Sequence, residues 1–243
     1  MSYNNGSRIV TDELQLFLDA GNIKSYPKSG ATWGDISKNN RSVTFYNAGG
    51  TTYSSSPAGA PTYSTGNNGT FTLDGVNDWG KFSQFTIGSA VTVSIWLKTS
   101  NAGGGGLLSH CSGGPVNIGY QISGGKMHYQ YYNTSWQNVT GTSTISDGTW
   151  KNCVWAKTGT SMLMYINGVL DATLTLTGDI SGPLCCVGSL WGPCNSDSYG
   201  AGTDSYGSVY SGDIGLVLIH GYRLSASEVL QNYNATKGRF GIK

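Results

Sequence analysis

The sequence predicts an all-β protein, on the evidence of its composition and its recurring turns. Glycine occurs 37 times, whereas only 11% of the 243 residues are charged. Threonine, serine, valine and tyrosine are frequent, and this mixture favours many strands joined by turns over helices. Turn-forming sequences recur at Asn68-Gly69, Asp74-Gly75, Ser123-Gly124-Gly125, Asp147-Gly148, Asn167-Gly168 and Gly178-Asp179.

The chain length fits a single domain. A two-sheet sandwich of about this size buries a good core, so length alone does not require a second domain. We expect residues 13–243 to form that domain. Residues 1–12 are polar and contain Gly and Asn, which predicts a flexible N-terminal arm, or one that docks on a neighbouring subunit.

The clearest local prediction is a hairpin near residue 167. Met162, Met164 and Ile166 alternate with the residues between them, which is the period-two pattern of a strand. Asn167-Gly168 is the strongest short signal for a tight hairpin turn. The sequence therefore predicts that residues 161–166 pair with residues 169–176.

The C-terminal part predicts one buried strand and then a short helix. Residues 214–219 are a short apolar run of the kind found in strands buried on both faces. Ser225 is followed three residues later by Glu228, which is the spacing of a capping box at a helix N-terminus. We expect the helix to continue to about Asn232.

These elements, taken in order with residues 71–79, 91–98 and 148–151, carry a family resemblance. The chain resembles the laminin-G-like branch of the concanavalin A-like lectin and glucanase superfamily, from roughly Leu14 to Phe240. The resemblance implies an antiparallel two-sheet jelly-roll sandwich with a short C-terminal helix. Residues 9–12, 18–22 and 25–27 are also similar to forms of this domain carried by tailed-phage structural proteins.

Because the superfamily includes glucanases, the acidic residues decide whether catalysis is expected. Retaining glycosidases need two carboxyl groups about 5 Å apart, and the glucanase branch supplies them from a Glu-x-Asp-x-x-Glu strand. This chain has only two glutamates, Glu13 and Glu228, and neither lies in that motif. His110, His128 and His220 have no nucleophile elbow near them. The sequence therefore predicts a protein that is not an enzyme.

Two regions are candidates for ligand binding. In residues 127–133, Tyr129 and Tyr131 share one face of a strand, and His128, Gln130 and Tyr132 share the other. The tyrosines either stack on sugar rings or fill the core, and the sequence leaves both interpretations open. The second region, residues 191–212, is a long stretch without alternation. Its aromatic side chains either contact a glycan or a protein, or fix the loop to its own sheet. They are Trp191, Tyr199, Tyr206 and Tyr210.

The resemblance also implies one structural calcium ion, because many relatives bind calcium beside the first and last strands. Asp213 lies where the family often supplies a carboxylate, and the Asp19 region is placed to contribute a carbonyl oxygen. Asp74, Asn77 and Asp78 form an alternative cluster, although Asp and Asn commonly bond their own backbone in turns. No other cofactor is expected.

The five cysteines do not show the spacing of a zinc site. Cys153 fits a buried strand position. Cys185 and Cys186 face opposite sides of a regular strand, so one of them is able to meet Cys194. We expect free thiols, because a reducing cytosol opposes disulfides.

Charge and hydropathy limit the partners. The net charge of +1 gives no basic surface for nucleic acid, and no apolar run is long enough to span a membrane. The first residues lack the features of a secretory signal, which predicts synthesis in a host cytoplasm. We expect a virion surface protein, on the capsid or a tail appendage, assembled with other virion proteins or as a homo-oligomer. Cell-surface glycan is a further expected partner, and a free-standing lectin module is the alternative.

Overall fold

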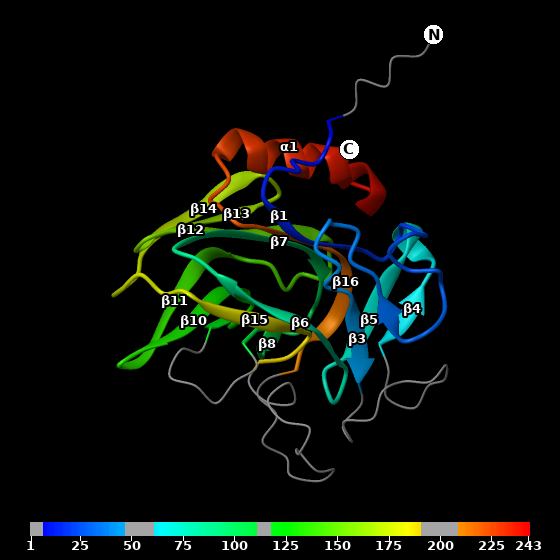
Figure 1. Ribbon diagram of the computed structural model, residues 1–243, viewed down its shortest axis with the longest axis horizontal. Coiled ribbons are helices and arrows are strands. Elements are labelled where there is room, and N and C mark those ends of the chain that lie inside the picture. Colours follow the sequence, from blue (N-terminus) through cyan, green and yellow to red (C-terminus); the bar gives the residue numbers. More distant parts are fainter. Residues whose placement is uncertain (1–6, 47–60, 111–117, 191–208) are drawn as a thin grey trace.

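The structure is a computed structural model, and it describes residues 7–46, 61–110, 118–190 and 209–243. Two antiparallel sheets stack face to face, and one short helix lies over the outer side of one of them (Figure 1). The predicted all-β sandwich with a C-terminal helix is therefore confirmed.

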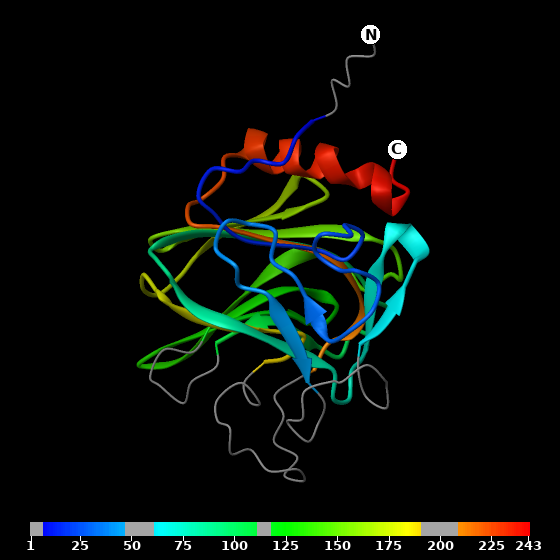
Figure 2. The ribbon, with the colours of Figure 1, turned by 45° about the vertical axis from the view of Figure 1, so that its right-hand side comes forward.

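The first sheet, sheet A, carries the helix on its outer face (Figures 1 and 2). Its strand order is β14-β13-β12-β7-β16-β5-β4, and β1 also pairs with β16. The strands are β1 (Leu14–Asp19), β4 (Thr62–Ser64), β5 (Thr70–Asp74), β7 (Ala90–Lys98), β12 (Lys151–Thr158), β13 (Ser161–Ile166), β14 (Val169–Thr175) and β16 (Ser211–His220).

The second sheet, sheet B, packs against the inner face of sheet A. Its strand order is β11-β10-β9-β8-β15-β6-β3-β2. The strands are β2 (Thr32–Trp33), β3 (Val43–Tyr46), β6 (Trp79–Ile87), β8 (Gly105–Ser109), β9 (Ile118–Ser123), β10 (Lys126–Asn133), β11 (Ser135–Thr144) and β15 (Gly182–Val187).

The main core lies between the two sheets and receives alternate side chains from both. In β1, for example, Leu14, Leu16 and Leu18 are buried while the residues between them are partly exposed. In β16, by contrast, every residue from Ile214 to His220 is buried. This continuous burial follows from the position of β16, which has the core on one side and the C-terminal elements on the other.

The predicted hairpin and the predicted buried strand both form. β13 pairs with β14 through Asn167 and Gly168, whose φ angles are 53° and 78°. These left-handed angles are what a tight hairpin turn of this kind requires. The predicted strand at residues 214–219 lies within β16.

The helix begins where the capping box predicts. α1 (Ala226–Thr236) has Ser225 as its N-cap, and both bonds of the capping box with Glu228 are present. The helix continues beyond the predicted end at Asn232 and leads into the short helix η3 (Lys237–Phe240). No helix among the described residues is long and apolar enough to cross a membrane.

The N-terminal segment is held on the domain from Arg8 onward. The Val10 amide donates to Asn232 Oδ1 at 2.7 Å, and His220 Nε2 lies 3.0 Å from the Val10 carbonyl oxygen. Gln231 Nε2 donates to the carbonyl oxygen of Arg8 at 2.8 Å. Residues 8–10 therefore bind to the end of β16 and to α1, and the boundary expected near residue 12 stays a prediction. Residues 1–6 lie outside the described residues.

The cysteines divide into two groups. Cys153 and Cys186 are free and buried, as expected for thiols that serve as small apolar side chains. Cys185 is disulfide-bonded, which corrects the expectation of a free thiol at that position. Cys111 and Cys194 lie outside the described residues.

Candidate functional site

The outer face of β9, β10 and β11, here called the β9–β11 face, gathers aromatic and amide side chains. The register places Tyr132 opposite Trp136, Gln130 opposite Asn138 and His128 opposite Thr140. Directly opposed residues of an antiparallel pair point to the same side of the sheet. The six side chains are therefore neighbours, on the side opposite to the sandwich core.

Tyr132 and Trp136 form the aromatic part of this face. Their ring centroids are 5.4 Å apart and their planes meet at 74°, an edge-to-face contact. Trp136 is 48% exposed, and it is the one aromatic residue among the large exposed hydrophobic side chains of the described residues. A half-exposed indole held by a neighbouring ring offers a flat apolar surface to a ligand.

The polar groups of the face are hydrogen-bonded to one another. Gln121 of β9 donates from Nε2 to Gln130 Oε1 at 3.2 Å. His128 Nδ1 lies 2.8 Å from Thr140 Oγ1, and burial lowers the pKa of His128 below its ordinary value of 6.5. The histidine is therefore uncharged at neutral pH. These contacts orient neutral donors and acceptors beside the aromatic pair, a combination typical of binding sites for uncharged polar ligands.

Tyr129 and Tyr131 lie on the other side of β10, within the core. Their side chains are 0% and 1% exposed, and their rings stack with centroids 5.5 Å apart. The Thr177 amide donates to the Tyr131 hydroxyl at 2.9 Å. Of the two interpretations of this strand, the structure shows the core-filling one. The expectation that these two rings contact a ligand is corrected, because the core takes the apolar face of the strand.

The candidate residues of the second region are separated by the structure. Tyr210 is 1% exposed, and its hydroxyl lies 3.1 Å from the Lys98 carbonyl oxygen and 3.3 Å from that of Asp213. Its expected contact with a ligand is therefore corrected to a contact with its own sheet. Trp191, Tyr199 and Tyr206 lie outside the described residues.

Asp213, the expected carboxylate ligand of calcium, and Asp19, whose region was expected to contribute a carbonyl oxygen, each pair with a basic side chain through their carboxylates. Asp213 lies 2.9 Å from Lys98 Nζ and accepts a hydrogen bond from Thr72 Oγ1 at 2.5 Å. Asp19 pairs with Arg239 and accepts from the Gly21 amide at 2.9 Å. Within the described ranges, no group of three or more His, Cys, Asp and Glu side chains is placed to hold a metal. The side chains of Asp213 and Asp19 are thus engaged within the chain, and calcium binding at these positions stays a prediction.

The alternative cluster at residues 74–78 is a turn that bonds its own backbone. Asp74 Oδ1 accepts from the amides of Val76 and Asn77, at 2.7 and 3.2 Å. Asp78 Oδ2 accepts from the Asp74 amide at 2.8 Å. Asp74 and Asp78 therefore bond the backbone of their own turn, which is the alternative to metal binding that the sequence allowed.

The most exposed aromatic residue of the face, Trp136, was not among the sequence candidates. Its strand has a weak alternation of apolar and polar residues, and most of its side chains are at least partly exposed. The turn before it contains Thr134 with φ 57° and no Asn-Gly pair. The sequence therefore gave no register that would place Trp136 opposite Tyr132. The one feature of the sequence that could have indicated an exposed aromatic residue here is a tryptophan within an otherwise mostly polar strand.

The family comparison agrees with the fold. The family model Laminin_G_3, described as concanavalin A-like lectin/glucanases superfamily, matches residues 65–230, which is more than half of the chain. No curated protein sequence matches the chain.

Solved structures share the architecture at low sequence identity. Domain 4 of AbnA, a GH43 extracellular arabinanase from Geobacillus stearothermophilus in complex with arabinotriose, is 15% identical with a TM-score of 0.67, covering 92% of this chain and 100% of that one. A botulinum neurotoxin type C structure, whose cell entry depends on interaction with two ganglioside molecules, is 16% identical with a TM-score of 0.62. That match covers 93% of this chain and 52% of the toxin chain, so the sandwich corresponds to about half of the toxin structure.

The binding domain of botulinum neurotoxin DC, in complex with rat synaptotagmin II, is 14% identical with a TM-score of 0.60, covering 93% of this chain and 52% of that one. Identities in this range show a common fold. The family match over residues 65–230 shows that the chain belongs to the laminin G family of the concanavalin A-like lectin/glucanase superfamily.

Proposed function

We propose that the chain is a non-enzymatic carbohydrate-binding domain displayed on the surface of a virus particle, and that it binds neutral sugars through the β9–β11 face. The observation that carries this proposal is the half-exposed Trp136 beside Tyr132, next to hydrogen-bonded amide side chains. Aromatic rings stack on the apolar faces of sugars, while amides and hydroxyls bond the sugar hydroxyl groups.

The paired side chains of β10 and β11 favour a neutral ligand, and Lys126 adds one positive charge at the end of the same side of β10. None of the six paired side chains of β10 and β11 that define it is acidic, and His128 is neutral at neutral pH. Gln130, Asn138 and Thr140 offer both donors and acceptors, as hydroxyl groups require. Relatives of the fold support a carbohydrate ligand, since one was solved with arabinotriose, a neutral sugar, and the cell entry of another depends on gangliosides.

The direct test is a glycan array probed with the purified chain and with Trp136→Ala. We expect the wild-type chain to bind a set of neutral oligosaccharides, and Trp136→Ala to weaken that binding by about tenfold, since a central aromatic contact is worth about 1–2 kcal/mol. Leu170→Ala is the matched control, because Leu170 is 50% exposed on β14 of sheet A. Equal loss in both variants, or no loss in Trp136→Ala, would contradict binding at this face.

The proposal that the chain is not an enzyme is supported by the surroundings of Glu228 and His220, which are hydrogen-bonded within the chain. Glu228 is engaged by Ser225 and by the Tyr222 hydroxyl, which donates to Glu228 Oε1 at 2.8 Å. His220 is fully buried at the Val10 carbonyl oxygen. We expect no release of reducing sugar from a polysaccharide panel. Release that disappears on mutation of one carboxylate would identify a hydrolase instead.

The virion location is supported by the similarity of residues 9–12, 18–22 and 25–27 to phage structural forms of the domain, and by the low charge of the chain. Mass spectrometry and immunogold labelling of purified particles test it. Stoichiometric presence on the head would indicate capsid decoration, and presence on the tail would indicate host-surface adhesion. Absence from particles, with glycan binding intact, would leave a free-standing lectin module.

A further inference from the structure

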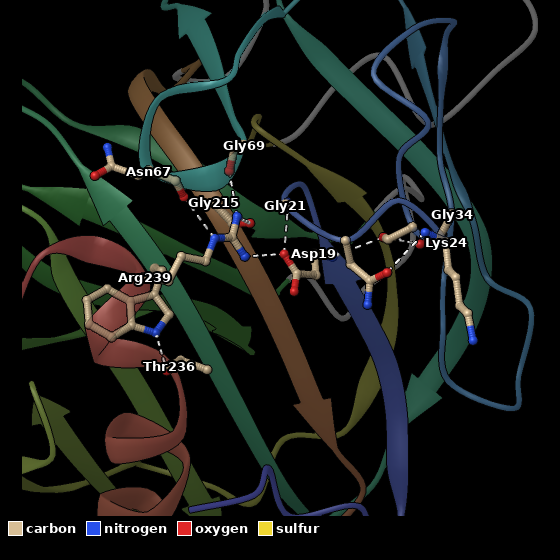
Figure 3. Close-up of polar contacts among 12 residues, drawn as sticks. Asp19, Gly21, Lys24, Gly34, Asn67, Gly69, Gly215, Thr236 and Arg239 are labelled. Atoms are coloured by element: carbon tan, nitrogen blue, oxygen red, sulfur yellow. Dashed lines mark hydrogen bonds and ion pairs between the residues drawn. The ribbon is translucent and has the colours of Figure 1, made fainter. Parts of the chain in front are cut away.

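Arg239 of η3 binds oxygen atoms from three other parts of the chain, where the ends of β1 and β5 meet beside β16 (Figure 3). Nε donates to the Asn67 carbonyl oxygen at 3.0 Å, and Nη2 donates to the carbonyl oxygens of Gly69 and Gly215, at 2.5 and 3.0 Å. Nη1 pairs with Asp19 Oδ1. One guanidinium therefore joins the turn before β5, the end of β1 and the middle of β16.

Glycines allow these backbones to approach the guanidinium. A Cβ on Gly21 would lie 2.2 Å from the Asn68 carbonyl oxygen and 2.8 Å from Arg239 Cζ. Gly69 has φ +116°, and a Cβ there would lie 2.3 Å from the Ala20 carbonyl oxygen. A Cβ on Gly215 would lie 2.5 Å from Phe240 Cε1. A Cβ on Gly21 would therefore contact the guanidinium itself, whereas a Cβ on Gly69 or Gly215 would displace the neighbouring backbone or the Phe240 ring.

The acceptors are three backbone carbonyl oxygens and one carboxylate oxygen, a set that suits a cation of any kind. Ca²⁺ is bound by oxygens of these two types, supplemented by water. In this chain the positive charge comes from Arg239, whose side chain is 14% exposed. Burial lowers the pKa of Arg239 and Asp19 opposes that shift, so the guanidinium remains charged at neutral pH.

We propose that the Arg239 guanidinium takes the place of a metal ion in an oxygen-lined cation site, and that it makes this chain independent of calcium. The site fixes η3 to the turn before β5, which are 172 residues apart along the sequence. Removal of the guanidinium takes one donor from each of the four oxygens. Asp19 Oδ1 then keeps the Gly21 amide and the Gly215 carbonyl keeps the Ala20 amide, and a hydrated divalent cation is able to occupy the vacated space.

The test measures melting temperatures of the full chain and of Arg239→Ala, each with a chelator and with added CaCl₂. We expect the wild-type value to be the same in both conditions. Arg239→Ala should melt at least about 5 °C lower in chelator, because buried acceptors lose their donors. Added CaCl₂ should recover part of that loss, whereas MgCl₂ should recover less, because Mg²⁺ tolerates irregular ligand sets poorly.

Arg223→Ala is the matched control, since Arg223 bonds a single hydroxyl, Ser161 Oγ, at 3.2 Å. Its melting temperature should change little and should not respond to calcium. Arg239→Lys covers the case in which the alanine variant does not fold. Its ammonium keeps the charge but lacks the fork that reaches all four oxygens, so it should melt between the wild type and Arg239→Ala, or fold where the latter does not.

Three results would overturn the proposal. The first is a rise in the wild-type melting temperature with calcium, which would show a metal site despite Arg239. The second is an Arg239→Ala variant as stable as the wild type. The third is a destabilised, folded Arg239 variant that does not respond to calcium, which would show that the oxygens serve only the guanidinium fork.

Discussion

The two outer faces of the sandwich differ in what covers them. The outer face of sheet A is sealed by the C-terminal elements, where Trp96 of β7 stacks against Phe240 and Tyr233 with centroids 4.2 and 5.8 Å apart. No helix among the described residues covers the outer face of sheet B (Figure 2). There the rings of Tyr132 and Trp136 are at least partly exposed.

The difference shows that similar residue types serve two purposes in one fold. A tryptophan under α1 removes apolar surface from water and stabilises the domain, because the surrounding rings exclude solvent. A tryptophan on the β9–β11 face keeps about half of its surface exposed and contributes less to folding. What distinguishes the two is the element packed above each strand, which lies far away in the sequence.

The largest expected effect is on the sealed face. Trp96→Ala should destabilise the fold by about 3–5 kcal/mol, because it opens a cavity under the helix. It also removes the hydrogen bond from Trp96 Nε1 to Thr236 Oγ1 at 2.8 Å. Urea unfolding followed by circular dichroism measures the change. A loss below about 1 kcal/mol would show that the C-terminal elements contribute little to the domain.

An effect of intermediate size is expected on the pH dependence of stability, from the turn that joins β5 of sheet A to β6 of sheet B. Asp78 is 2% exposed, and burial raises the pKa of its carboxyl to about 6. The hydrogen bond from the Asp74 amide lowers this pKa, whereas the negative charge of Asp74 raises it. The unfolded chain releases this proton near pH ~4. The folded state therefore binds more protons between about pH 4 and 6, and stability falls as pH rises through that window.

Asp78→Asn removes this ionisation, so it should flatten the pH dependence and stabilise the fold at pH 7 by roughly 1–3 kcal/mol. Unfolding curves between about pH 4 and 7 measure both effects. Asp12→Asn, which removes one exposed carboxylate, is the control for the loss of a negative charge. An unaltered slope in Asp78→Asn would show that Asp78 ionises normally in the folded state.

A smaller effect is expected at the start of the covering helix. Ser225→Ala removes the capping hydroxyl that accepts from the Glu228 amide at 3.3 Å and should cost about 1 kcal/mol. The exposed Ser7→Ala provides a comparison in the same unfolding assay and should have no measurable effect. Equal values for the two variants would show that the cap does not limit the stability of the helix.

The smallest effect is expected on the open face. Trp136→Ala should change stability by less than about 1 kcal/mol, because the indole is already half in water. Measured beside Trp96→Ala, it gives the contrast between the two faces directly. A loss as large as that of Trp96→Ala would mean that Trp136 is a structural residue, and any loss of glycan binding in this variant would then report on folding.

The sequence by itself determined the features that rest on local chemistry. The Asn167-Gly168 turn, the apolar run of β16 and the Ser225–Glu228 capping box all form as predicted, because each depends on residues within a few positions of one another. The all-β class followed in the same way, from composition and turn spacing.

Tertiary structure decided which faces are buried and which residues meet. The alternation in β10 shows that Tyr129 and Tyr131 share a side, but only the packing of the two sheets places that side in the core. Likewise, pairing of β10 with β11 brings Trp136 to Tyr132, and the fold brings Arg239 to Asn67. These contacts join distant or irregularly spaced residues, and their energies depend on the whole sandwich, so no local pattern in the sequence encodes them.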